Sequence, residues 1–246
     1  MGVLARGRIA DGAYAAEWVF TDRHGGVSTG AYSTLNLGAS VGDGPEAVAV
    51  NRATAAGYLG GDALALMRQV HGRNVVTLDG CPAEPSDADA ALTSTPDLIL
   101  GTQIADCVPI LLADLVGGQV AAVHAGWRGV VAEVVDAALD AMAAPGPVHA
   151  WIGPAICPGC YEVSAEVRAE ICDVVPEAWA TTRQGTPAVD VRAAVLTQLA
   201  NRGIAGELVG GCTFESPDLF SYRRDGVTGR QMGLIVLRAE GGSTDD

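Results

Sequence analysis

At 246 residues, the chain is long enough to bury a substantial hydrophobic core. Its formal charge of −14 argues against a nucleic-acid partner, because a phosphate backbone attracts clustered basic residues. All 15 basic residues are arginine, which excludes Schiff-base lysine chemistry and the lysine of a phosphate-binding loop. An anionic substrate must therefore be held by guanidinium groups, backbone N–H groups or a metal.

The sequence carries no targeting or membrane signal that we can identify. Its N-terminal segment lacks the apolar core of a signal peptide, and no apolar run approaches the ~20 residues of a membrane span. We therefore expect a cytoplasmic protein with a small-molecule substrate and no membrane partner. Six cysteines are too few for a disulfide scaffold in a chain of this length, and in the cytoplasm they should stay reduced.

Short runs rich in Val, Ile and Leu predict strands, and apolar residues at helical spacing predict helices. The expected strands are residues 17–21, 64–67, 75–78, 98–104, 108–113, 119–123, 149–152, 208–209 and 232–237. The expected helices are residues 47–59, 130–142, 161–175 and 191–202. Residues 80–89 are expected to form a surface loop. We predict the α+β (mixed α/β) class: one domain over residues 1–240, with mixed sheets layered with helices, and a disordered tail at 241–246.

The stretch from Ala105 to Gly129 is the centre of this pattern. Its two apolar runs are joined by a turn at Gly117-Gly118, and pairing them as a hairpin would place Cys107 beside His124. His71, at the end of another apolar run, offers a third ligand. Two imidazoles and one thiolate from three segments suit a zinc site with one open position, which is the arrangement of catalytic zinc.

Two other features point to anion or ligand binding by backbone. After His124 the order strand, glycine-containing turn, helix predicts free N–H donors near the imidazole. Gly26 to Gly30 matches the G-x-S-x-G pattern of serine hydrolases, but a turn-like polar stretch follows it instead of a helix. A glycine-rich loop that lets backbone approach a ligand, or a plain connector, is therefore favoured there.

The remaining cysteines are expected to contribute little. Cys157 and Cys160 form a Cys-x-x-Cys pair, which suits a redox motif or half of a structural zinc site, but no second pair follows at close spacing. Cys81, Cys172 and Cys212 have no ligand-like neighbours in the sequence. We expect these three to be buried or idle thiols.

Several motifs spread along the chain resemble one bacterial family. They are RHGGVS at 23–28, LNL at 35–37 with VGD at 41–43, QVHG at 69–72, ADC at 105–107, HAGWRG at 124–129, GPAI at 153–156 with CYEV at 160–163, and SYRRD at 221–225 with GR at 229–230. HAGWRG and FSYRRDG are the most specific. The sequence is similar to the polyphenol oxidase or laccase-domain family, also called the peptidoglycan editing factor or purine nucleoside phosphorylase family, over about residues 15–238.

The resemblance implies both a metal site and a reaction. It implies that His71, Cys107 and His124 are the metal ligands and the catalytic residues, and that the metal is zinc. It further implies phosphorolysis of adenosine, inosine, guanosine or methylthioadenosine, together with deamination of adenosine. The family motifs also supply candidate substrate- and phosphate-binding residues: Arg23, Ser28, Asn36, Arg128, Arg223 and Arg224.

Other activities remain open at this level. Copper is disfavoured, because a four-copper laccase needs about ten histidines and this chain has four. A single blue-copper centre with Met67 is arithmetically allowed. The family is also associated with removal of a wrong amino acid from a UDP-MurNAc precursor of peptidoglycan. A metal-free mechanism would use Cys107 as nucleophile and His124 as base.

Overall fold

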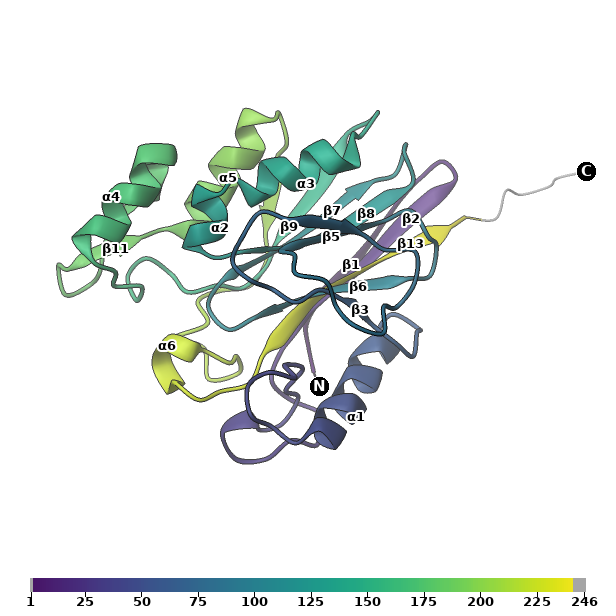
Figure 1. Cartoon of the computed structure of the whole chain (residues 1–246), viewed down its shortest axis with the longest axis horizontal. Coiled ribbons are helices and arrows are strands. Elements are labelled where there is room, and N and C mark those ends of the chain that lie inside the picture. The colour runs from purple at the N-terminus through teal and green to yellow at the C-terminus, as the bar shows by residue number, and fades with distance from the viewer. Residues whose placement is uncertain (1, 241–246) are drawn as a thin grey trace, which may run out of the picture.

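Two β-sheets lie face to face at the centre of the computed structural model, which describes residues 2–240 (Figure 1). In order across the larger sheet, the strands are β12 (Gly206–Leu208), β9 (Val148–Ile152), β7 (Val108–Asp114), β8 (Gln119–Ala125), β5 (Ala90–Thr93) and β4 (Val75–Thr77). In order across the other, they are β1 (Val3–Asp11), β2 (Tyr14–Thr21), β13 (Gln231–Ala239), β6 (Ile99–Ile104) and β3 (Ala65–Leu66). A small third sheet pairs β10 (Trp179–Thr181) with β11 (Pro187–Val189).

Helices cover the outer faces of the two large sheets. The α-helices are α1 (Pro45–Gly57), α2 (Trp127–Val131), α3 (Val134–Met142), α4 (Ala165–Val174), α5 (Val191–Asn201) and α6 (Tyr222–Asp225), with 3-10 turns at Gly30–Tyr32 and Pro176–Ala178. Parallel and antiparallel pairs occur in both large sheets, so the predicted α+β class with mixed sheets is confirmed. The predicted tail at 241–246 lies outside the described residues. Among residues 2–240, no helix has the length and apolar character needed to cross a bilayer.

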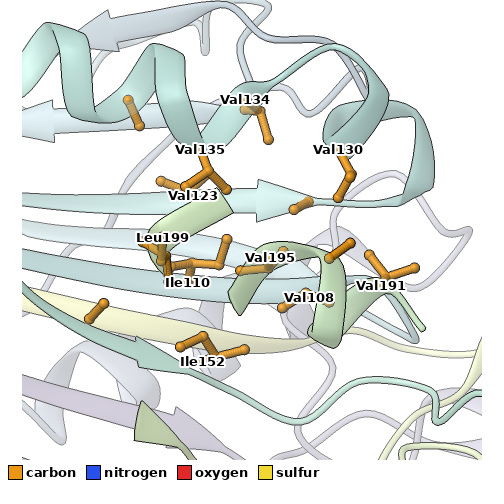
Figure 2. Packing of buried hydrophobic residues seen from close by; sticks show 14 of the residues in the cluster. Val108, Ile110, Val123, Val130, Val134, Val135, Ile152, Val191, Val195 and Leu199 are labelled. Atoms are coloured by element: carbon orange, nitrogen blue, oxygen red, sulfur yellow. The ribbon is translucent and has the colours of Figure 1, made fainter. Parts of the chain in front are cut away.

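Three apolar clusters separate four layers of structure. One lies between α2, α3, α4 and α5 and the six-stranded sheet, one between the two sheets, and one between the five-stranded sheet and α1. Figure 2 shows the first, where Val108 and Ile110 of β7 face helix residues such as Val195. Leu111, one residue further along β7, belongs to the cluster between the sheets. Because β7 is buried on both faces, its sequence is a continuous apolar run instead of an alternating one.

Most predicted elements form, with shifts that have local causes. The helix expected at 130–142 is split into α2 and α3, because Glu133 takes a left-handed conformation with φ of 61°. The helix expected from residue 161 begins at Ala165, where the Ser164 side chain caps it by accepting from the backbone N–H of Val167. The predicted cap of α5 is confirmed, since Asp190 accepts from the backbone N–H of Ala193.

The structure also contains strands that the sequence reading missed. β1 pairs with β2 as an antiparallel hairpin at the edge of its sheet, where arginines alternate with small or apolar residues. β5 lies between β8 and β4 in a stretch rich in alanine, a weak strand former. Both strands depend on pairing with neighbours that a local pattern does not specify.

Candidate metal centre

The hairpin of β7 and β8 positions two of the three predicted ligands. In its register Val108 lies opposite Ala125 and Pro109 opposite His124, so the predicted pairing is confirmed. Cys107 immediately precedes β7 and therefore lies at the same end of the sheet as His124. His71 reaches this end from the segment after β3, in a left-handed conformation with φ of 59°.

The three side chains converge. Their ligand atoms all lie within 4.8 Å of one another, with Cys107 Sγ 3.8 Å from His71 Nε2. The imidazole rings of His71 and His124 are nearly perpendicular, at 85°, with centroids 4.8 Å apart. Tetrahedral zinc, with bonds of about 2.3 Å to sulfur and 2.0–2.1 Å to nitrogen, places these two kinds of atom ~3.6 Å apart. The donor set and its spacing thus fit a metal ion, and this group could bind one.

A buried carboxylate holds two of these segments together. Asp89 is fully buried and lies 2.8 Å from Nδ1 of His124. It also accepts from the backbone N–H groups of Val70, His71 and Gly72, at 3.2, 3.0 and 2.6 Å. The sequence reading placed Asp89 at the end of a surface loop, which is wrong for this residue because it enters β5 with its side chain pointing inward. Such a contact fixes the tautomer and orientation of a metal-binding imidazole.

The electrostatics of the site favour a charged sulfur. Burial alone would raise the pKa of Cys107, but attraction to His124 and hydrogen bonds from His124 and His71 lower it to about 6. Burial alone would lower the pKa of His124, but the charge of Cys107 and the hydrogen bond to Asp89 raise it to about 9. The thiolate is the form that binds a metal and the form that attacks as a nucleophile.

Gly126 leaves the room that the site needs. A Cβ atom at this position would lie 3.0 Å from His71 Cδ2 and 3.1 Å from Cys107 Sγ. Any other residue would therefore press on two of the three ligand side chains. Gly126 also caps the five-residue helix α2, so the predicted order of strand, turn and helix is present.

The three ligands open onto a cleft of about 940 Å³. Of the predicted substrate-binding residues, Arg128 and Arg223 line it. The Arg128 guanidinium stacks on Trp127, 4.4 Å from the ring centroid. Arg223 lies over Tyr161 at 4.9 Å and donates from Nη1 to the carbonyl oxygen of Glu162 at 2.6 Å. The cleft therefore combines guanidinium groups with aromatic rings close to the metal ligands.

The other four candidates do not line this cleft. Ser28 donates to Asp43 at 2.6 Å, and the Asn36 amide donates to the same carboxylate at 2.9 Å. Arg23 donates from Nε to the carbonyl oxygen of Ser33. Arg224 donates to four backbone carbonyls, those of Thr213, Phe214, Ser216 and Leu219. These contacts hold loops in place, and a part in substrate binding stays a prediction for all four residues.

The hydrolase-like loop does not form a nucleophile elbow. A 3-10 turn, Gly30–Tyr32, follows Ser28 in place of the α-helix that the motif requires. Ser28 is 3% exposed and its hydroxyl is already bonded to Asp43. The glycine-rich segment is bonded to α1 through Asn51, which accepts from the backbone N–H of Val27 and donates to the Ser28 hydroxyl.

The structure adds cleft residues that the sequence reading did not select. Arg52, Arg68 and Arg230 also line the cleft. Arg230 lies in the Gly-Arg motif at 229–230, so the family resemblance could have identified it from the sequence. Burial lowers its pKa, and its Nη1 donates to the carbonyl oxygens of Thr228 and Gly229.

Asp106, just before Cys107, has a positive φ of 101°. Its carboxylate accepts from the hydroxyls of Thr213 and Ser221, both at 2.6 Å, and from the backbone N–H of Arg223 at 2.7 Å. These contacts hold a backbone conformation that non-glycine residues rarely adopt, and they fix the start of β7.

Known proteins resemble this chain along most of its length. Residues 17–238 match the family described as multi-copper polyphenol oxidoreductase laccase. The chain belongs to this family. A purine nucleoside phosphorylase of Streptomyces griseus is 47% identical over 245 residues, covering 96% of this chain and 100% of the relative. Another, of Streptomyces coelicolor, is 49% identical over 232 residues, covering 90% and 96%.

Solved structures share the fold along most of the chain. A Neisseria meningitidis protein has a TM-score of 0.83 at 37% identity, covering 91% of this chain and 95% of its own. The YlmD protein of Geobacillus stearothermophilus has a TM-score of 0.83 at 29% identity, covering 94% and 98%.

The description of this family refers to several copper ions, but this family member has few copper ligands. It contains four histidines in all. His24 pairs with Asp218 and His149 stacks on Trp151. Within residues 2–240, only one group of three or more ligand residues contains histidine. The chain therefore offers one His-and-Cys metal site and no set of imidazoles for a four-copper cluster.

Proposed function

We propose that this protein is a zinc-dependent purine nucleoside phosphorylase that also deaminates adenosine. The substrates are adenosine, inosine, guanosine or methylthioadenosine together with inorganic phosphate. The observation that carries the proposal is the convergence of His71, Cys107 and His124 on an arginine-lined cleft. Support comes from relatives that are named purine nucleoside phosphorylases and match this chain along nearly its whole length.

His71, Cys107 and His124, which line the cleft, would hold the metal. A zinc ion bound there would supply a Lewis acid and lower the pKa of a coordinated water. Asp89 lies against Nδ1 of His124 and fixes the tautomer that leaves Nε2 free as a ligand. Gly126 keeps the space beside the ligands open.

In phosphorolysis, the bond from the sugar C1′ to the purine nitrogen breaks as a phosphate oxygen bonds to C1′. Arg128 and Arg223 hold the phosphate, since guanidinium groups pair with its oxygens through charge-assisted hydrogen bonds. Trp127 and Tyr161, which carry these two guanidinium groups on their rings, also line the cleft and add apolar surface for the purine. In deamination, water adds at C6 of the purine and ammonia leaves.

A metal-free use of the same site has one observation in its favour. The lowered pKa of Cys107 and the raised pKa of His124 suit a thiolate nucleophile beside an imidazolium acid. This mechanism predicts activity that survives complete removal of metal. The zinc mechanism predicts activity that is lost with the metal and restored by it.

The test is nucleoside turnover by purified, zinc-loaded protein. With adenosine, phosphate should be required for release of free adenine and ribose 1-phosphate, and inosine should appear without it. His71→Ala should abolish both reactions. Arg192→Gln, which changes a partly exposed arginine outside the cleft, should leave both unchanged. Zinc-loaded protein that releases neither adenine nor inosine would show the proposal to be wrong and leave amide hydrolysis on a cell-wall precursor as the leading activity.

A further inference from the structure

A second cluster of metal-ligand side chains lies outside the candidate centre. The thiols of Cys157, Cys160 and Cys212 come within 4.8 Å of one another. Cys212 was expected from the sequence to have no ligand-like neighbours, which is wrong. A parallel bridge between Ala155 and Cys212 brings its segment against the Cys-x-x-Cys turn.

The local geometry presents three sulfurs together with donors aimed at them. The backbone N–H of Cys160 donates to the carbonyl oxygen of Cys157 at 3.0 Å, closing the turn that places both thiols on one side. The backbone N–H of Cys157 donates to Cys212 Sγ at 3.2 Å. Nη1 of Arg183 donates to Cys160 Sγ, also at 3.2 Å. Hydrogen bonds of this kind stabilise the charged form of a thiol, whereas burial and the neighbouring sulfurs raise the pKa of Cys157 and of Cys160 while no cation is bound.

We propose that Cys157, Cys160 and Cys212 form a second metal site, which binds a soft divalent cation such as Zn²⁺ through three thiolates. Tetrahedral zinc with bonds of about 2.3 Å places its sulfur ligands ~3.8 Å apart, within the separation found here. Three thiolates this close repel one another unless a cation lies between them. Arg183 pairs with Glu215 and also donates to Cys160 Sγ, so a cationic and an anionic side chain both lie beside the cluster. The Cys160 thiol donates to the Glu215 carboxylate at 3.7 Å, and once the thiol is deprotonated this carboxylate offers a fourth ligand.

A metal site explains the cluster better than a disulfide does. A disulfide between Cys157 and Cys160 would use two of the sulfurs and leave Cys212 with no function in the cluster. All six cysteines are free thiols in the structure. A trithiolate site uses all three sulfurs, and the Cys157 N–H group donates to the third of them.

The role of this site is structural. It would join the segment at 153–162 to the segment at 212–216, and both contact Asp106. The backbone N–H of Ile156 donates to the Asp106 carbonyl oxygen at 2.9 Å, and the Thr213 hydroxyl donates to its carboxylate. Tyr161, directly after the turn, lines the cleft. A cation here would therefore fix one wall of the cleft and the residue that precedes Cys107.

The decisive measurement is zinc content per chain after reconstitution under reducing conditions and removal of free metal. Wild-type protein should hold about two zinc ions. The double variant His71→Ala/His124→Ala should keep one, and Cys212→Ser should lose one. Cys81→Ser, which changes an exposed thiol elsewhere, should lose none. Because the double variant lacks the candidate centre, its metal content reports the trithiolate site whatever the proposed activity proves to be.

Cobalt substitution gives a second readout that does not depend on whether Cys212→Ser folds. In the His71→Ala/His124→Ala background, Co²⁺ should give an intense thiolate-to-cobalt charge-transfer band, which zinc abolishes by displacement. Double-variant protein that shows no such band and takes up no zinc overturns the proposal. So does isolation of Cys157 and Cys160 as a disulfide that, once reduced, still binds no metal.

Discussion

Replacing Asp89 with asparagine tests whether the buried carboxylate organises the metal centre. One carboxylate oxygen accepts from His124 Nδ1 and the His71 N–H, and the other accepts from the N–H groups of Val70 and Gly72. Asparagine has the same shape but only one acceptor oxygen. In either orientation, its NH₂ group must face two of these four partners.

The size of the effect follows from those contacts. If the NH₂ group faces Val70 and Gly72, two backbone donors lose their acceptor, at about 1–3 kcal/mol each when buried. The segment at 70–72 is partly exposed, so we expect a total near the lower end, about 2 kcal/mol of unfolding free energy. If the NH₂ group faces His124 instead, the imidazole must change tautomer, which puts its proton on Nε2. Metal affinity should then fall by about 10–100-fold.

Two measurements check this. Urea unfolding in the presence of a chelator gives the change in free energy of the metal-free protein, and competition with a chelating dye gives zinc affinity. Asp87→Asn is the matched control, because this exposed carboxylate pairs only with Arg68 at the surface, and neither quantity should change. An Asp89→Asn protein that unfolds within about 0.5 kcal/mol of wild type and binds zinc equally well would refute the reasoning.

Further predictions concern space, charge and acid stability. Gly126→Ala should weaken zinc binding by roughly tenfold, because its Cβ crowds two ligands; Gly44→Ala, with open space around its Cβ, should bind zinc normally. Arg128→Gln should raise the KM for phosphate by about tenfold or more while changing the KM for nucleoside little, as initial rates will report. The hydrogen bond from Arg224 holds the pKa of Asp225 below its ordinary 3.8, so this carboxylate stabilises the fold above that pH and less as pH falls through it. Asp225→Asn should therefore lower Tm near neutral pH, and the difference from wild type should shrink in acid; a constant difference would contradict this.

The hairpin of β7 and β8 shows what a local sequence pattern can predict. Its two apolar runs and the glycine turn predicted both strands and their pairing, because residues buried on both faces leave an uninterrupted apolar signal. The pairing in turn placed Cys107 beside His124. Helix α5 was equally predictable from its Asp190 cap and from Gly203, which follows it with a positive φ. Such features depend on residues a few positions apart.

Features that depend on contacts between distant segments could not be predicted from local sequence patterns. Asp89 looked like part of an acidic loop, and Cys212 looked like an idle thiol. Both are placed by sheet pairing with segments far away in sequence. For Arg23 and Arg224 the structure adds bonds to backbone carbonyls that the motifs did not predict, and their part in substrate binding stays a prediction.

The sequence by itself determined the chemistry available to this protein: all-arginine cations, few histidines and the residue types of the candidate ligands. It also determined the elements whose periodicity is local. Only the tertiary structure decided which of these side chains meet, because strand order and register bring together residues that no short pattern relates. His71, Cys107 and His124 could be named in advance because the hairpin pattern and the family motifs pointed to them. Asp89 beneath them and the thiols of Cys157, Cys160 and Cys212 could be grouped only in three dimensions.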